Sequence, residues 1–219
     1  MKKLKAISIS NLYNKKFATM PLPEGEFFTV LGGNKQVMPK GGIWLVHGDE
    51  KQGKTTLCLS LANYLSKRNR VLYIQVEQST NAIDIDKIFV EAMQRVGISV
   101  NNRALSFFGD INIDNIVELL KRKRSADIIF IDNITFATWI NTQVVRDLSK
   151  QFSNKTFVYI AHNDRDGEPN GSTGKAVKRL ANTIFSVDSL RCNIYGRGDW
   201  GGNINIDWKK GLVMYGQDE

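Results

Sequence analysis

The chain has 219 residues, of which 42% are hydrophobic and 24% charged, and its formal net charge is +8. This composition is typical of a soluble globular protein, and the length suits one α/β domain with a buried core. It excludes a membrane-spanning protein, because no stretch approaches the roughly 20 consecutive apolar residues that a transmembrane helix needs. The N-terminus lacks the apolar region of a signal peptide. We therefore expect a cytoplasmic protein with no membrane partner.

Residues 1–40 are predicted to be a basic, irregular segment, because prolines and a glycine pair interrupt its short apolar runs. The regular pattern begins after residue 40, so residues 41–219 are predicted to form the core domain. The elements expected there are, in chain order, a strand at 43–47, a helix at 54–68, a strand at 71–76, a helix at 83–96, a strand at 105–108, a helix at 113–124 begun at Asn112 or Asp114, a strand at 127–131, a helix at 141–152, a strand at 156–161, a helix at 175–181, and strands at 183–187, 191–195, 204–208 and 212–215.

Short apolar strands that alternate with amphipathic helices indicate crossover connections and a parallel sheet covered on both faces. After residue 163 the pattern changes to closely spaced strands separated by glycine-rich turns, which favours an antiparallel extension at one edge. The predicted fold class is therefore α/β, a mostly parallel twisted sheet flanked by helices with a C-terminal antiparallel strand extension. The two cysteines, Cys58 and Cys192, are expected to be unpaired thiols.

The segment GDEKQGKT, which joins the first expected strand to the first expected helix, matches the pattern GxxxxGK[ST]. Its glycines let several backbone N–H groups point at one anion, and the start of the following helix adds the positive end of its dipole. We expect Lys54 to reach the β- and γ-phosphates of a nucleotide, Thr55 to coordinate Mg²⁺, and Thr56 to lie near the α-phosphate. The predicted nucleotide-binding residues of this loop are Gly48, Asp49, Glu50, Lys51, Gln52, Gly53, Lys54, Thr55 and Thr56.

Three polar residues stand at the ends of other predicted strands, and parallel strands bring their carboxyl ends to one edge of the sheet. Asp132 ends the apolar run IIFI and is predicted to be the second magnesium residue. Glu77 ends VLYIQV and is predicted to take the proton of an attacking water. His162, with Asn163 beside it, follows TFVYIA and is a candidate γ-phosphate sensor. Each of the three also has a structural alternative, since polar residues are common at strand ends.

Basic residues gather in the first forty positions and in the run Lys121–Arg124. A basic surface favours a nucleic-acid partner through counterion release. Lysine and arginine also suit the negative end of a helix dipole, so the run at 121–124 has an equally simple structural explanation.

From Phe28 onward the chain resembles the RecA-like ATPase core of the RadA, KaiC and DnaB branch. The similar segments are FTVLGGNKQVMPKGG with the phosphate loop and the strand ending in glutamate, ADIIFIDNIT, and HNDRDGEPNGSTG followed by LANTIFSVD. The resemblance implies ATP and Mg²⁺ as cofactors, Glu77 as catalytic glutamate, and the loop 163–175 as a DNA-contacting loop. It also implies a ring, such as a hexamer, or a filament, in which Arg197 completes the ATP site of a neighbouring subunit.

The chain departs from that pattern in three ways. The phosphate loop contains DEKQ instead of small residues, and His162 stands where a glutamine is usual. The sequence has no segment similar to the zinc module, the protease-like domain or the helicase N-terminal domain of fuller relatives, so we expect a bare core of the kind found in some small phage or plasmid ATPases.

We therefore predict a Mg-dependent ATPase that acts on DNA, most simply single-stranded DNA, with ATP bound between subunits. The alternative is a KaiC-like module whose assembly is switched by nucleotide, with slow hydrolysis and no direct work on DNA. A small-metabolite kinase is disfavoured, because the sequence offers no arginine-rich lid.

Overall fold

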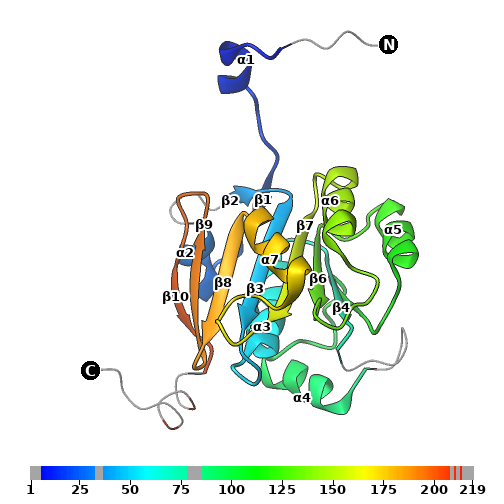
Figure 1. Cartoon of the computed structure of the whole chain (residues 1–219), viewed down its shortest axis with the longest axis vertical. Helices are drawn as coiled ribbons and strands as arrows, with labels where there is room; N and C mark the ends of the chain where they lie inside the picture. Colours follow the sequence, from blue (N-terminus) through cyan, green and yellow to red (C-terminus); the bar gives the residue numbers. More distant parts are fainter. Residues whose placement is uncertain (1–5, 33–36, 78–84, 208–209, 211–212, 214–219) are drawn as a thin grey trace.

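The computed structural model describes residues 6–32, 37–77, 85–207, 210 and 213. Its centre is an eight-stranded sheet with the order β10-β9-β8-β3-β7-β6-β4-β5. The strands from β8 to β5 are parallel to their neighbours, whereas β8, β9 and β10 form an antiparallel meander at one end. The predicted fold class, a mostly parallel sheet flanked by helices with antiparallel C-terminal strands, is confirmed (Figure 1).

The strands are β1 (Thr19–Pro21), β2 (Val37–Pro39), β3 (Gly42–Gly48), β4 (Val71–Gln75), β5 (Leu105–Phe108), β6 (Ile128–Asp132), β7 (Thr156–His162), β8 (Thr183–Asp188), β9 (Arg191–Gly196) and β10 (Gly202–Asn205). The helices are α1 (Ile9–Tyr13), α2 (Glu26–Gly32), α3 (Lys54–Ser66), α4 (Lys87–Arg95), α5 (Ile113–Lys121), α6 (Thr142–Gln151) and α7 (Gly171–Leu180). None of these helices is both long enough and apolar enough to cross a membrane, within the part of the chain that the structure describes.

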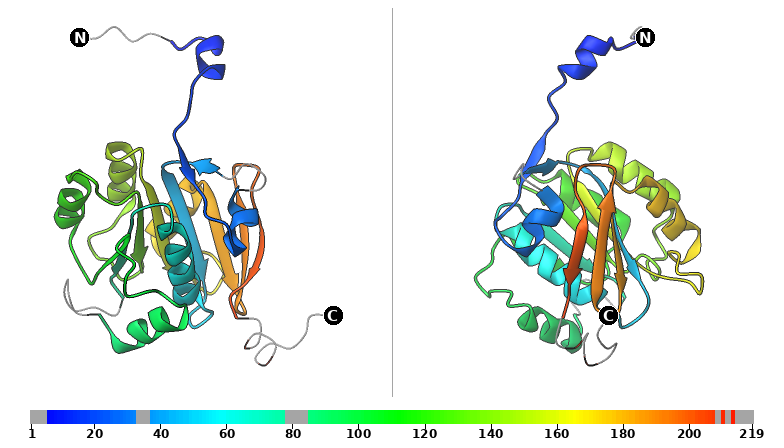
Figure 2. Two further views of the ribbon diagram at one scale, coloured as in Figure 1. Left: turned by 180° about the vertical axis from the view of Figure 1, so that it is seen from behind. Right: turned by 90° about the vertical axis from the view of Figure 1, so that its left-hand side faces the viewer.

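Helices cover both faces of the large sheet, and the alternation of side chains along each strand divides the core into two layers. On one face, Trp44, Tyr73 and Phe130 pack with residues of α2, α3 and α4. On the other face, Leu45 and Ile131 belong to the layer that also holds residues of α5, α6 and α7. Figure 2 shows the two helical layers on opposite sides of the sheet. The central strands are buried on both sides, which explains their continuous apolar sequences.

Residues 19–39 are more regular than the sequence indicates. β1 and β2 form a small antiparallel sheet, in which Met20 pairs with Met38. α2 buries Phe27 and Leu31 in the core layer beneath α3. The irregular structure predicted for residues 1–40 is therefore wrong for this stretch, while a domain boundary near residue 40 stays a prediction. α1, in contrast, has no buried residue and stands away from the body in Figure 1.

The later elements differ from expectation at their ends. The helix expected at 175–181 begins at Gly171, four residues earlier than predicted, and so includes the end of the loop expected at 163–175. The strand expected at 204–208 is β10, which pairs from Gly202 to Asn205. Part of the helix expected at 83–96 and most of the strand expected at 212–215 lie outside the described residues, and Val213 is not in a strand. Of the two residues predicted to begin the helix at 113–124, Asn112 is the N-cap of α5.

Asp127 connects three segments at the amino-terminal edge of the sheet. Its Oδ1 accepts a hydrogen bond from Lys40 Nζ at 2.9 Å, and its Oδ2 accepts bonds from Arg70 N and Nε at 3.2 Å. Partial burial raises the pKa of Asp127, but the hydrogen bonds from Lys40 and Arg70 outweigh it, so the pKa lies below its ordinary 3.8. The ionised carboxylate therefore stabilises the folded chain.

Asp127→Asn is expected to lower the free energy of unfolding by about 1–2 kcal/mol at pH 7, because it removes the charge from these hydrogen bonds. Since the pKa is lower in the folded chain, this contribution is present above the ordinary pKa and is lost as the pH falls through the folded value. Urea unfolding at several pH values checks this. If the difference in free energy of unfolding between the wild type and Asp127→Asn stayed constant from pH 7 to pH 2.5, the prediction would be wrong.

Candidate nucleotide site

The loop between β3 and α3 lies at the carboxyl-terminal edge of the sheet. Gly53, at the N-cap of α3, has φ of +96°, in the region that favours glycine. A Cβ on Gly48 would lie 2.2 Å from the carbonyl oxygen of Val187, so the loop also passes too close to β8 for any side chain there. No side chain caps α3, so the N–H groups of its first turn are available to an anion.

Lys54 is the first residue of α3, and its side chain turns back into the loop. The residue is 5% exposed, and its Nζ donates a hydrogen bond of 2.6 Å to the carbonyl oxygen of Asp49. Burial lowers the pKa of Lys54, and the negative charges of Asp132 and Glu77 raise it in part. The ammonium group thus lies between the loop and two carboxylates, where it can exchange a backbone carbonyl for a phosphate oxygen.

Asp132 ends β6 and is buried. Its Oδ2 accepts a hydrogen bond of 2.5 Å from the hydroxyl of Tyr73, on the neighbouring strand β4. Burial raises the pKa of Asp132 to about 6, although the Tyr73 hydroxyl and the Lys54 ammonium both lower it. Tyr73 uses one carboxylate oxygen, which leaves Oδ1 for a metal ion or one of its water ligands. A buried carboxylate with a raised pKa is stabilised when a cation binds beside it.

Glu77 follows β4, and its carboxylate contacts His162, the last residue of β7, and Asn133, which directly follows β6. His162 Nε2 lies 3.3 Å from Oε1, and Asn133 Nδ2 donates to Oε2 at 3.4 Å. The hydrogen bond with His162 is the largest influence on the pKa of Glu77, which lies below its ordinary 4.5 although partial burial raises it. Glu77 is therefore ionised at neutral pH and can accept a hydrogen bond from a water molecule.

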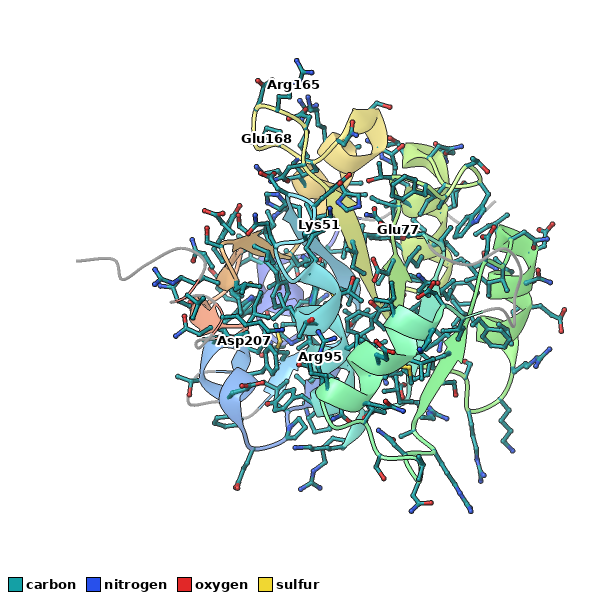
Figure 3. All side chains as sticks on the ribbon, turned by 90° about the horizontal axis from the view of Figure 1, so that it is seen from below. Lys51, Glu77, Arg95, Arg165, Glu168 and Asp207 are labelled. Carbon is teal, nitrogen blue, oxygen red and sulfur yellow. The ribbon has the colours of Figure 1, made fainter. Side chains whose placement is uncertain are left out.

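These side chains line a cleft of about 520 Å³ at the edge of the sheet that faces the viewer in Figure 3, where Lys51, Glu77 and Arg95 are labelled. The predicted site residues that line it are Glu50, Lys51, Gly53, Lys54, Thr55, Thr56, Glu77, Asp132 and His162. The structure thus brings together most of the residues that the sequence assigns to one site.

Sequence reasoning missed three lining residues, Gln75, Ile88 and Arg95. Gln75 is the polar residue of an otherwise apolar strand, and it pairs in register with Asp132, so its position carried a usable signal. Ile88 and Arg95 are on α4, and nothing in the sequence indicates that this helix turns toward the phosphate loop.

Three other loop residues predicted to bind nucleotide do not line the cleft through their side chains. Asp49 contributes its carbonyl oxygen to Lys54, and Gln52 Oε1 accepts a hydrogen bond of 2.8 Å from Ser189 N, which fastens the loop to the β8–β9 turn. Gly48 is the last residue of β3.

Arg197 lies far from this cleft. It follows Gly196, which pairs with Thr183 at the start of β8, and its own N–H bonds to Asn182 O, at the amino-terminal edge of the sheet. Its Nη2 donates to the carbonyl oxygen of Arg179 at 2.8 Å. Arg197 therefore cannot act on the nucleotide of its own subunit, and a role at a neighbour's site stays a prediction.

The residues after β7 form a short closed loop beside the cleft. Asn163 and Pro169 pair as an isolated bridge, and Asn163 Oδ1 lies 2.8 Å from His47 Nδ1. Two ion pairs with α7, Lys175 with Asp164 at 2.9 Å and Lys178 with Glu168 at 2.8 Å, hold the loop in place. Figure 3 shows Arg165 and Glu168 at its exterior.

The residues present fit a triphosphate with a divalent cation. The first turn of α3 offers N–H groups, Lys54 offers a buried ammonium, and Asp132 with the Thr55 hydroxyl offers hard oxygen ligands of the kind that Mg²⁺ prefers. Side chains on Gly48 or Gly53 would collide with Val187 or Leu190, so the shape of this loop depends on its glycines.

Comparison with known proteins agrees with this geometry. The chain is 28% identical over 181 residues to the DNA repair protein RadA of Campylobacter jejuni, covering 76% of this chain and 38% of that protein. It is 32% identical over 120 residues to the protein RecA of Nautilia profundicola, covering 53% and 32%. The chain thus spans less than two fifths of either relative.

The solved structure of the flagellar accessory protein FlaH from Methanocaldococcus jannaschii has the same fold, with a TM-score of 0.57 at 18% identity, covering 86% of this chain and 93% of that one. Fold and site together define a RecA-like, ATPase-related domain of the nucleotide-binding class. Within that class, residues 26–165 match the model of the family described as iSTAND, inactive STAND, and the chain belongs to this family. Its closer placement in the RadA, KaiC and DnaB branch stays a prediction.

Proposed function

We propose that this protein binds Mg-ATP in the cleft and hydrolyses it, and that single-stranded DNA is its partner. The observation that carries the proposal is the convergence of Lys54, Asp132 and an ionised Glu77 on one cleft at an uncapped helix start. A structural role alone would not require a buried ammonium beside two carboxylates, because burying charges is costly unless they are used or paired.

In this proposal the backbone N–H groups of the loop and of the first turn of α3 hold the phosphates, and Lys54 leaves Asp49 O to bind the β- and γ-phosphates. Thr55 and Asp132 hold Mg²⁺, which neutralises the charge of the phosphates when bound. Glu77 orients the attacking water and accepts its proton. His162 and Asn133 fix the direction in which Glu77 points, through the contacts of 3.3 and 3.4 Å described above.

The DNA part of the proposal has support from three sources. The formal net charge is +8, and the similar RadA protein is a DNA repair protein. Arg165 is exposed on the loop after β7, directly beyond His162, which contacts Glu77. We propose that the state of the γ-phosphate reaches this loop through the Glu77–His162 contact, and that assembly in a ring or filament places Arg197 at a neighbouring site.

A second function, an ATP-dependent switch of assembly with slow hydrolysis, is favoured by the description of the family as inactive and by the hydrogen bond of Lys54 to its own loop. In this case ATP binding rearranges Lys54, and Glu77 contributes little turnover.

ATP turnover, with and without single-stranded DNA at low salt, tests the first function. We expect the rate to rise several-fold with DNA. If DNA neither binds nor changes the rate, the DNA part is wrong, and a shift in molecular size with a non-hydrolysable ATP analogue would then support the switch.

A further inference from the structure

A second hollow lies at the amino-terminal edge of the sheet, opposite the nucleotide cleft. It has a volume of about 270 Å³ and lies where β4, β5 and β6 begin. These strands are parallel, so the residues that precede them gather at one place. Five of the lining residues are cationic: Arg70, Arg103, Arg122, Lys123 and Arg124.

The floor of this hollow is apolar and includes Leu72, Phe108 and Leu119. A neighbouring hollow of about 320 Å³ shares Phe108, Leu119 and Arg122 with it, so the two form one groove along α5. We call it the α5 groove. β5 is the last strand of the sheet, and α5 lies at that end of the molecule, away from β10 (Figure 1).

Three of the five cations that line the α5 groove have no acidic partner among the described residues, whereas Arg70 pairs with Asp127. Arg103, Lys123 and Arg124 are exposed, and none of them has an ion-pair or hydrogen-bond partner among the described residues. Arg122 pairs with Glu118 at 2.6 Å, but both side chains are more than 60% exposed, and such a pair contributes little to stability. A competing anion can therefore take Arg122 over at small cost.

We infer that the α5 groove binds the backbone of single-stranded DNA, with Arg103, Lys123 and Arg124 on phosphates and a base against the apolar floor at Phe108. Cations on the rim of a groove with an apolar, partly aromatic floor match a chain that alternates phosphates with flat bases. A purely acidic chain such as polyglutamate would match the cations but has no flat apolar group for the floor. The helix dipole of α5 does not account for the whole basic run at 121–124, because the helix ends at Lys121 and the next three residues lie beyond it.

This inference rests on the DNA part of the proposed function and extends it, because it adds a DNA contact at the edge of the sheet opposite the ATP cleft to the one proposed for the loop after β7. The DNA site is therefore expected to work without nucleotide, and its loss is expected to leave ATP binding intact.

The test compares two triple variants by fluorescence anisotropy, with a labelled oligothymidine and without nucleotide. The groove variant carries Arg103→Gln, Lys123→Gln and Arg124→Gln, which remove charge but keep the side-chain stems. The control carries Arg146→Gln, Lys150→Gln and Arg179→Gln, which remove the same charge from exposed positions on α6 and α7. ATP binding is measured on both.

Each phosphate contact contributes about 0.7 to the slope of log K against log salt concentration for single strands. The groove variant loses three phosphate contacts, so the magnitude of that slope is expected to fall by about 2. Because 0.1 M lies about one logarithmic unit below 1 M salt, the same change weakens binding about 100-fold at 0.1 M. The control is expected to stay within about three-fold of the wild type.

If the two variants lose DNA affinity equally, or the groove variant loses none, the inference is wrong. Such a result would leave the proposed function standing, because the wild type would still bind DNA and turn over ATP. If the wild-type protein binds polyglutamate as tightly as DNA through these residues, the groove is a site for an acidic protein, and the inference is wrong. Failure of the wild type to bind ATP would instead count against the proposed function.

Discussion

Lys54→Ala is expected to weaken Mg-ATP binding at least about 100-fold, because it removes a buried charge from the phosphates. The residue is 5% exposed, and it is placed between the loop carbonyl of Asp49 and the carboxylates of the cleft. Without the ammonium, Asp132 and Glu77 would also repel the triphosphate. Isothermal titration with Mg-ATP measures the loss directly.

Lys67→Ala is the matched control, because Lys67 is the C-cap of the same helix, α3, at the end away from the cleft. Both variants should unfold as cooperatively as the wild type in a thermal scan. If the affinity of Lys54→Ala for Mg-ATP were within three-fold of that of the wild type, the loop would not bind a triphosphate as described.

Glu77→Gln is expected to lower the rate of ATP turnover by about 10²–10⁴, the usual contribution of a general base, while Mg-ATP affinity changes only a few-fold. The amide keeps the size of the side chain and can still contact Asn133 and His162, so the geometry of the cleft should persist. It cannot accept the proton of an attacking water. Single-turnover kinetics, which separate binding from chemistry, measure the effect.

The comparison for Glu77→Gln is Glu91→Gln, which removes an exposed carboxylate on α4 outside the cleft and should leave the rate within a few-fold of the wild type. If Glu77→Gln turned over ATP at the wild-type rate, the base would have to be Glu50 or Asp49, and the role assigned to Glu77 would be wrong.

The large sheet could be predicted from sequence because its information is local. Runs such as IWLV and IIFI are apolar throughout, which is what strands buried on both faces require, and amphipathic segments separate them. The same logic placed Glu77, Asp132 and His162 at one edge, since each follows a parallel strand. It could not give the contact between Glu77 and His162, which depends on the order of strands in the sheet.

The errors come from segments whose structure depends on distant partners. α7 begins within NGSTG, a poor helix sequence, yet ion pairs from Lys175 and Lys178 to the preceding loop and the burial of Val177 stabilise it there. β1 and β2 pair across residues 22–36, and only that pairing makes strands of such short, proline-containing segments. Arg95 lines the cleft because α4 packs in the same core layer as α3, a tertiary placement that no local pattern records.

The most direct measurement for the whole account is a titration of the pure, folded protein with labelled ATP, in the presence and absence of Mg²⁺. The account predicts saturable uptake of one nucleotide per chain that strengthens with Mg²⁺ and is lost in Lys54→Ala. Absence of any saturable uptake by folded wild-type protein would contradict both proposed functions, the ATPase that acts on DNA and the ATP-dependent switch of assembly.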